Sequence, residues 1–112
     1  MIYEMNLQHS PFNAIKEGRK DIEMRLYDER RKNIAIGDVI NFTNLENGEK
    51  MSVRVINLYR FNNFEELYDS FDKSRLGYLP NQEARPTDME IYYPIEKIVR
   101  CGVLAIEIEL IK

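Results

Sequence analysis

Apolar and polar residues alternate in five segments of the chain, and this period of two is the pattern of β-strands. Between the third and fourth segments, the Asn47-Gly48 pair favours a tight hairpin turn. In the second segment the apolar residues are expected to face the core, whereas the other face presents two acids, a base and a phenol. Strands are predicted at Ile2–Leu7, 21–27, Val39–Thr43, Met51–Phe61 and Val103–Ile111.

Three short helices are expected to connect these strands. Ser10 can cap the free N–H groups of the first helix, and Pro11 fits its first helical position. The other two helices begin with the spacing of a capping box. Residues 28–33 are too polar for a core and are expected to form a surface turn or short helix. The helices are predicted from Ser10 to Gly18, from Asn63 to Phe71 and from Thr87 to Tyr93, where Pro94 interrupts the last, and a loop is predicted around Gly77, Pro80 and Pro86.

Strands connected by short helices predict the α+β class, mainly β, as a small and mostly antiparallel, partly closed barrel. The 112 residues, 44% hydrophobic and 31% charged, are expected to form a single soluble domain, 1–112. The sequence shows no signal-peptide pattern and no apolar run near the ~20 residues of a membrane span. The lone Cys101 cannot form an intramolecular disulfide. We therefore expect a cytoplasmic protein that does not bind membranes.

The charges nearly balance overall but are unevenly spread. The net charge is −3, and residues 1–60 carry ten basic and nine acidic groups, against six and ten in 61–112. Such a protein is not expected to clamp duplex DNA, because duplex binders neutralise many phosphates at once. Seven basic residues within 16–32 mark the segment that an anionic ligand would meet first. Alternatively, this segment is a solvated face of surface salt bridges.

One octet after the first predicted helix has the pattern Gly-x-Lys-x-x-Glu-x-Arg. It reads Gly18-Arg19-Lys20-Asp21-Ile22-Glu23-Met24-Arg25. It is flanked by Phe12–Ile15 in the helix, by Gly37–Phe42 in the next strand, and by Met89–Tyr93 and Gly102–Glu107 near the C-terminus. Together these segments resemble the ASCH domain family of the PUA-like superfamily, and the chain is similar to its small bacterial stand-alone members.

The resemblance implies a six-stranded PUA-like barrel, with short helices over a cleft that the octet lines, and a role in binding RNA or nucleotides. One branch of the family removes the acetyl group of N4-acetylcytidine with a lysine, a threonine three residues later and a distant glutamate. Lys20 matches that lysine, whereas Glu23 replaces the threonine, and a carboxylate cannot take the hydroxyl's nucleophilic role directly. The distant acid falls in the region of Glu83, Asp88 and Glu90.

Lys20, Glu23 and Arg25 place a cation, an acid and a second cation within six residues. Glu23 and Arg25 share a strand face, because side chains repeat at every second position, and the long stem of Lys20 can reach the same side. As a binding site, the trio suits a phosphate at Arg25 and a base or ribose edge at Glu23. As a catalytic site, it suits Lys20 as a base and Glu23 directing a water. The third alternative is an exposed ion pair on a sheet face.

Tyrosines are the aromatic candidates for stacking on an unpaired base. Tyr92 and Tyr93 are adjacent in a predicted helix, so at most one of them can stack while the other packs. A single Cys and a single His supply no metal-ligand set, and no phosphate-cradling glycine loop occurs, so neither a metal nor a cofactor is expected. The candidate tyrosines are Tyr27, Tyr59, Tyr78, Tyr92 and Tyr93.

The sequence favours a protein that holds an unpaired nucleotide in a charged cleft, with single-stranded RNA, a nucleotide or a modified nucleoside as its partner. The alternative is a small hydrolase of a modified nucleoside or of RNA phosphodiesters, with Lys20 and Glu23 as catalytic residues. A third hypothesis is a protein-interaction module that binds through the acidic half, 61–112. The ligand-binding residues of the first hypothesis are Lys20, Glu23, Arg25, Tyr27, Tyr92 and Tyr93.

Overall fold

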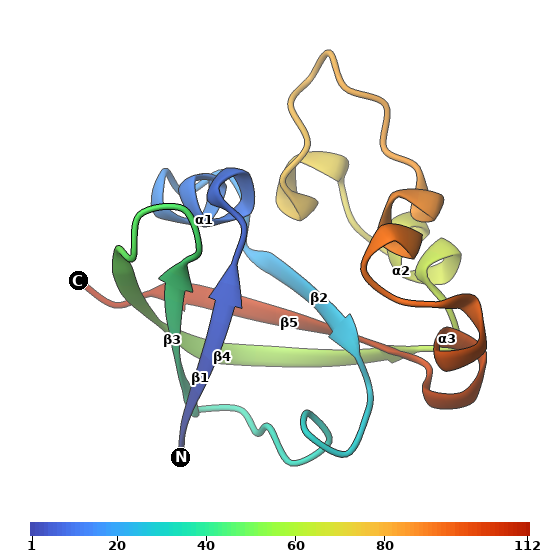
Figure 1. The fold of residues 1–112 in the computed structure, drawn as a ribbon, viewed down its shortest axis with the longest axis horizontal. Helices are drawn as coiled ribbons and strands as arrows, with labels where there is room; N and C mark the ends of the chain where they lie inside the picture. The colour runs from blue at the N-terminus through green and yellow to red at the C-terminus, as the bar shows by residue number, and fades with distance from the viewer.

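The computed structural model describes residues 1–112 and contains one five-stranded sheet (Figure 1). The strand order is β1-β3-β4-β5-β2. β1 and β3 run parallel, whereas the other three pairs are antiparallel. The sheet is therefore mixed, and its predicted segments are confirmed to within two residues at each end. The strands are β1 (Ile2–Leu7), β2 (Ile22–Leu26), β3 (Val39–Asn44), β4 (Lys50–Phe61) and β5 (Val103–Leu110).

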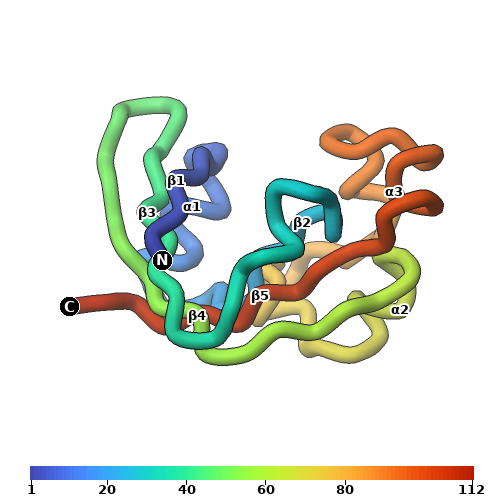
Figure 2. Tube along the Cα trace, turned by 90° about the horizontal axis from the view of Figure 1, so that it is seen from below, coloured from blue at the N-terminus to red at the C-terminus, as the bar shows by residue number.

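The sheet curls into a half-barrel whose two edge strands, β1 and β2, do not pair with each other (Figure 2). The resemblance implied six strands, and the structure corrects this number to five. Because no sixth strand joins the edges, the barrel stays open between β1 and β2. Arg25 of β2 reaches across this opening, where its Nη2 atom donates a hydrogen bond to the carbonyl oxygen of Asn6 at 3.1 Å.

The two faces of the sheet are covered by separate hydrophobic cores. The first core fills the inside of the curl and includes Phe12 of α1 (His9–Lys16) and Phe42 of β3. The second core covers the other face under α2 (Phe64–Ser70), α3 (Ile95–Cys101) and the 3₁₀ helices η1 (Lys73–Leu76) and η2 (Pro86–Ile91). Figure 1 shows these C-terminal helices grouped beside β2, on the opposite side of that strand from α1. Both faces of strand β2 are thus covered by other parts of the protein.

The predicted capping signals have different outcomes. At α2 the prediction is confirmed, because the Asn63 side chain accepts a hydrogen bond from the Glu66 backbone N–H at 2.9 Å. At α1 the prediction is wrong, because the helix begins at His9 and Ser10 makes no cap hydrogen bond. The Thr87 box is also wrong: a 3₁₀ helix begins at Pro86 without a side-chain cap.

Helix α3 was not predicted, because Pro94 was interpreted as the end of a helix. In the structure Pro94 is the N-cap, where a proline ring fits because the first helical N–H groups need no intrahelical partner. The region of Gly77 and Pro80 was predicted as a loop, and η1 precedes Gly77 there. Residues 29–33 form the expected surface turn. None of the helices is long and apolar enough to cross a membrane.

Candidate nucleotide-binding cleft

A cleft of about 550 Å³ lies above β2. Residues 6–11 at the end of β1 and the start of α1 form one wall, and residues between 76 and 93 form the other. Lys20, Glu23, Met24 and Arg25 contribute from β2 and the turn before it. Five of the six predicted ligand-binding residues therefore line one cleft; the exception is Tyr27.

The charged trio forms a connected cluster in this cleft, with Glu23 at its centre. Lys20 Nζ lies 3.0 Å from Glu23 Oε1. Arg25 donates to Glu23 Oε2 through Nε at 3.0 Å and through Nη2 at 2.7 Å. The backbone N–H of Met24 also donates to Oε1, at 3.3 Å. Each carboxylate oxygen of Glu23 thus has two polar contacts.

The cluster is buried, which rules out the alternative of an exposed ion pair. The Lys20 and Glu23 side chains are 6% and 4% exposed, and that of Arg25 is 13% exposed. Burial follows from the position of β2, since the second core covers the face of Met24 while the walls of the cleft enclose the face of Glu23. Gly77 packs directly on the stem of Lys20, and a Cβ atom there would lie 3.2 Å from Lys20 Cδ.

Glu23 is ionised near neutral pH. Burial alone would raise its pKa, but the charges of Lys20 and Arg25 and their hydrogen bonds outweigh that effect and hold the pKa at about 2. A carboxylate with this pKa binds no proton near neutral pH. It holds its two cationic neighbours in fixed positions instead.

The aromatic wall contains Tyr92 and Tyr93, which have different environments. Tyr93 stacks on Phe64, with ring centroids 6.1 Å apart and planes 15° apart. Tyr92 is 52% exposed and its ring is tilted by 57° relative to that of Tyr93. One ring therefore packs while the other is available to a ligand, as adjacent tyrosines require. Burial raises the pKa of the Tyr93 phenol, and the nearby Arg25 lowers it.

A hydrogen-bonded chain of side chains borders the cleft on the same wall. Tyr78 donates to Asp88 Oδ2 at 2.7 Å, and the Tyr68 and Tyr78 hydroxyls are 2.8 Å apart. Burial and these two partners raise the pKa of Tyr78. Sequence reasoning did not identify Tyr68, whose helical stripe indicated only packing. Among the three candidates for a distant acid, Asp88 alone lines the cleft.

The structure places Tyr27 elsewhere. Tyr27 lines a separate shallow depression with residues 28–30, Lys32 and residues 100–101, and the Arg60 guanidinium lies 3.8 Å from the centroid of its ring. The strand pattern put Tyr27 on the face of Glu23 and Arg25, and Tyr27 does pack against the first core there, but it follows the end of β2 at Leu26 and lies outside the cleft. Glu83 pairs with Arg85 outside the cleft at 2.7 Å. No three acidic, Cys or His side chains lie close enough together to hold a metal ion.

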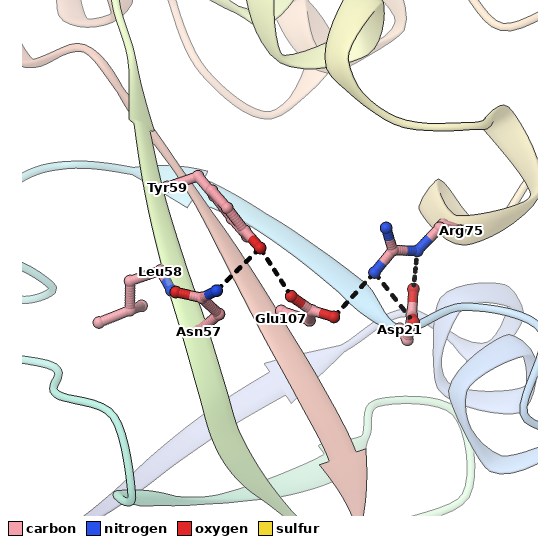
Figure 3. Close-up of polar contacts among 6 residues, drawn as sticks. All are labelled: Asp21, Asn57, Leu58, Tyr59, Arg75 and Glu107. Carbon is pink, nitrogen blue, oxygen red and sulfur yellow. Dashed lines mark hydrogen bonds and ion pairs between the residues drawn. The ribbon is translucent and has the colours of Figure 1, made fainter.

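A second polar network fixes η1 against the sheet (Figure 3). Arg75 Nε and Nη2 contact the Asp21 carboxylate at 2.9 and 3.2 Å, and Nη2 also contacts Glu107 at 2.9 Å. Tyr59 donates to the other Glu107 oxygen at 2.9 Å and accepts from Asn57 at 2.9 Å. The wall of the cleft that contains Gly77 is thereby tied to β5.

Comparisons with known proteins agree with this architecture. The model of the ASCH domain family matches residues 5–112. The crystal structure of hypothetical protein PH0355 has 35% sequence identity and a TM-score of 0.85, over 99% of this chain and 100% of that one. The solution NMR structure of protein PF0455 from Pyrococcus furiosus has 38% identity and a TM-score of 0.73, over 100% and 99% of the two chains. No curated protein matches the sequence.

The family match extends over nearly the full chain and includes the octet at the centre of the cleft. The two similar structures share its curled sheet and short helices. The resemblance inferred from the octet and its flanks is confirmed: the chain belongs to the ASCH domain family.

Proposed function

We propose that the cleft binds one unpaired nucleotide of a single-stranded RNA. The observation that carries this proposal is the buried cluster of Lys20, Glu23 and Arg25 within a cleft of about 550 Å³. Two desolvated cations are costly to maintain unless they are paired and fixed. Their position in an accessible cleft supports a recognition role, because paired charged groups with perturbed pKa values in a cleft are typical of functional sites.

The donors of Lys20 and Arg25 are the groups that would contact the ligand. An ammonium carries three N–H donors and a guanidinium five. Glu23 engages one contact of Lys20, together with Nε and Nη2 of Arg25, so further donors of both cations are left for the ligand. Glu23 itself accepts three hydrogen bonds, pairs with Lys20, and is a positioning residue. This revises the expectation that Glu23 contacts a base or ribose edge directly.

The walls of the cleft suit a base better than several phosphates. Lys20 and Arg25 are matched by Glu23 and Asp88, so the formal charges of the lining cancel. The exposed ring of Tyr92 supplies a surface on which a base can stack, a contact that contributes about 1–3 kcal/mol. The Asp88 carboxylate on the same wall can accept from an exocyclic amino group.

Hydrolysis is the less favoured function. That function would need Glu23 to direct a water, whereas both of its carboxylate oxygens already have protein partners. Lys20 is held by the same carboxylate. Release of acetate from N4-acetylcytidine, or cleavage of an RNA oligonucleotide by the purified protein, would reverse this preference.

The proposal is tested by measuring the affinity of a short single-stranded RNA for three variants. Tyr92→Ala removes an exposed ring and is expected to weaken binding about tenfold without changing the melting temperature. Lys20→Met removes the cation but keeps its stem, and is expected to weaken binding further.

Val99→Ala is the matched control, since Val99 is 79% exposed on α3 and lies outside the cleft. Equal affinity of Tyr92→Ala, Lys20→Met and the unmodified protein would contradict the proposal. In that case a protein partner for the acidic half would become the better hypothesis.

A further inference from the structure

Three arginines without a carboxylate partner surround the shallow depression that Tyr27 lines. Arg30 and Arg100 line the depression, and Arg60 lies over the Tyr27 ring at 3.8 Å. All three are exposed, and none takes part in an ion pair. We call Arg30, Arg60 and Arg100 the arginine patch.

Most other cations of the basic segment 16–32 are already neutralised by neighbours. Lys16 pairs with Glu49, and Arg19 pairs with Glu17 at 3.0 Å. The acids of the depression are also engaged, since Asp28 binds Arg31 at 2.7 Å and Glu29 binds Lys32 at 2.8 Å. The arginine patch is therefore a local excess of positive charge on a protein whose net charge is −3.

The patch lies close to the cleft in the sequence. Tyr27 follows Arg25 by two residues, which corresponds to roughly 7 Å of extended backbone. Stacked nucleotides of one strand are about 3.4 Å apart, so this distance is of the order of one or two nucleotide steps. Arg60 is held in place by its contact with the Tyr27 ring, which reduces the entropy lost on binding an anion.

We propose that the arginine patch binds the phosphates of the nucleotides next to the one held in the cleft. This inference rests on the proposed function, because it requires an RNA strand that leaves the cleft. Guanidinium groups suit phosphates, since their planar N–H donors match two phosphate oxygens at once. The cleft would then select one base, while the patch would add affinity without reading sequence.

The experiment compares an uncharged nucleoside with a single-stranded RNA hexamer of mixed sequence, each titrated against the unmodified protein and against Arg30→Ala/Arg100→Ala. The double variant is expected to bind the hexamer about tenfold more weakly at low salt, roughly threefold for each lost contact. The slope of log affinity against log salt concentration should fall by about 1.4, because each phosphate contact on a single strand contributes about 0.7. Nucleoside binding should not change.

Lys50→Ala/Arg54→Ala is the matched control. It removes two cations that form no ion pair, from the half of β4 remote from Arg60, and it should leave hexamer affinity unchanged. An equal loss of hexamer affinity in both double variants would indicate a general charge effect and would overturn the proposal. So would an unmodified protein that binds the hexamer no more tightly than the nucleoside, although the proposed function would then stand. If neither probe binds, the proposed function itself fails.

Discussion

Two ion-pair networks meet at the start of β2, and they differ in burial more than in composition. Glu23 joins Lys20 and Arg25 in the cleft, whereas Asp21, two residues earlier, joins Arg75 and Glu107 on the other side of η1. The Glu23 side chain is 4% exposed and that of Asp21 is 42% exposed. Similar groups therefore form a buried cluster in one place and a partly exposed anchor of η1 in the other.

Ion pairs of similar length therefore differ in how much they contribute to stability. Charges near water interact weakly and are screened by salt. Charges enclosed by protein interact strongly, but each depends on its partner to offset lost hydration. Removing one charged group should accordingly lower the free energy of unfolding strongly in the Glu23 cluster and weakly in the Asp21 network.

The largest expected effect comes from neutralising the two acids in turn. Glu23→Gln leaves two buried cations without a counter-charge and is expected to lower the free energy of unfolding by about 3–5 kcal/mol. Asp21→Asn should lower it by about 1 kcal/mol or less, because Arg75 keeps Glu107 and has access to water. Urea denaturation at pH 7 measures both values. Similar losses for the two variants would show that burial does not separate the networks.

Lowering the pH should reproduce the loss of stability that is expected for Glu23→Gln. The pKa of its carboxyl is about 2 in the folded protein and about 4.5 in the unfolded chain, so the unfolded chain takes up the proton first as the pH falls. The stabilisation is therefore complete above pH 4.5 and is lost as the pH falls towards 2. It amounts to about 3 kcal/mol, at 1.36 kcal/mol per pH unit. Glu23→Gln should show a flatter pH dependence than the unmodified protein over this range, and identical slopes would contradict the assigned pKa.

A smaller effect should separate the wall of the cleft from an ordinary turn. Gly77 and Gly48 both have positive φ angles, +107° and +75°, so alanine at either site should cost about 1–2 kcal/mol of stability. Only at Gly77 would the new methyl group press on Lys20, while the space around Gly48 is open. RNA affinity is therefore expected to fall severalfold in Gly77→Ala and to stay constant in Gly48→Ala. Equal affinities in a binding titration would mean that Gly77 does not position Lys20.

The sheet could be predicted from the sequence because its signal is local. In β1, β4 and β5, the alternation of apolar and polar residues predicts strand ends that lie within one residue of the observed ends. Helix α3 escaped prediction because Pro94 was interpreted as a helix end, although the spacing of Ile95, Ile98 and Val99 is helical. The 3₁₀ helices η1 and η2 are too short to produce a recognisable hydrophobic period in the sequence.

The membership of the cleft was partly predictable, whereas its geometry was not. Spacing alone placed Glu23 and Arg25 on one face, and the structure confirms their contact. Their burial depends on Gly77 and the residues that follow it, which pack beside β2 from more than fifty positions away in the sequence. No local pattern reports such a contact. Tyr27 was misplaced for a related reason, because alternation along a strand does not show how far along that strand a cleft extends.

The central claim is that the buried cluster, and not the exposed network, meets RNA. The most direct test is an NMR titration of isotope-labelled protein with a short single-stranded RNA. We predict that resonance shifts concentrate at Lys20, Glu23, Arg25 and Tyr92, while those of Glu107 and Tyr59 stay in place. Shifts centred on Glu107 and Tyr59, or no shifts at all, would contradict the account.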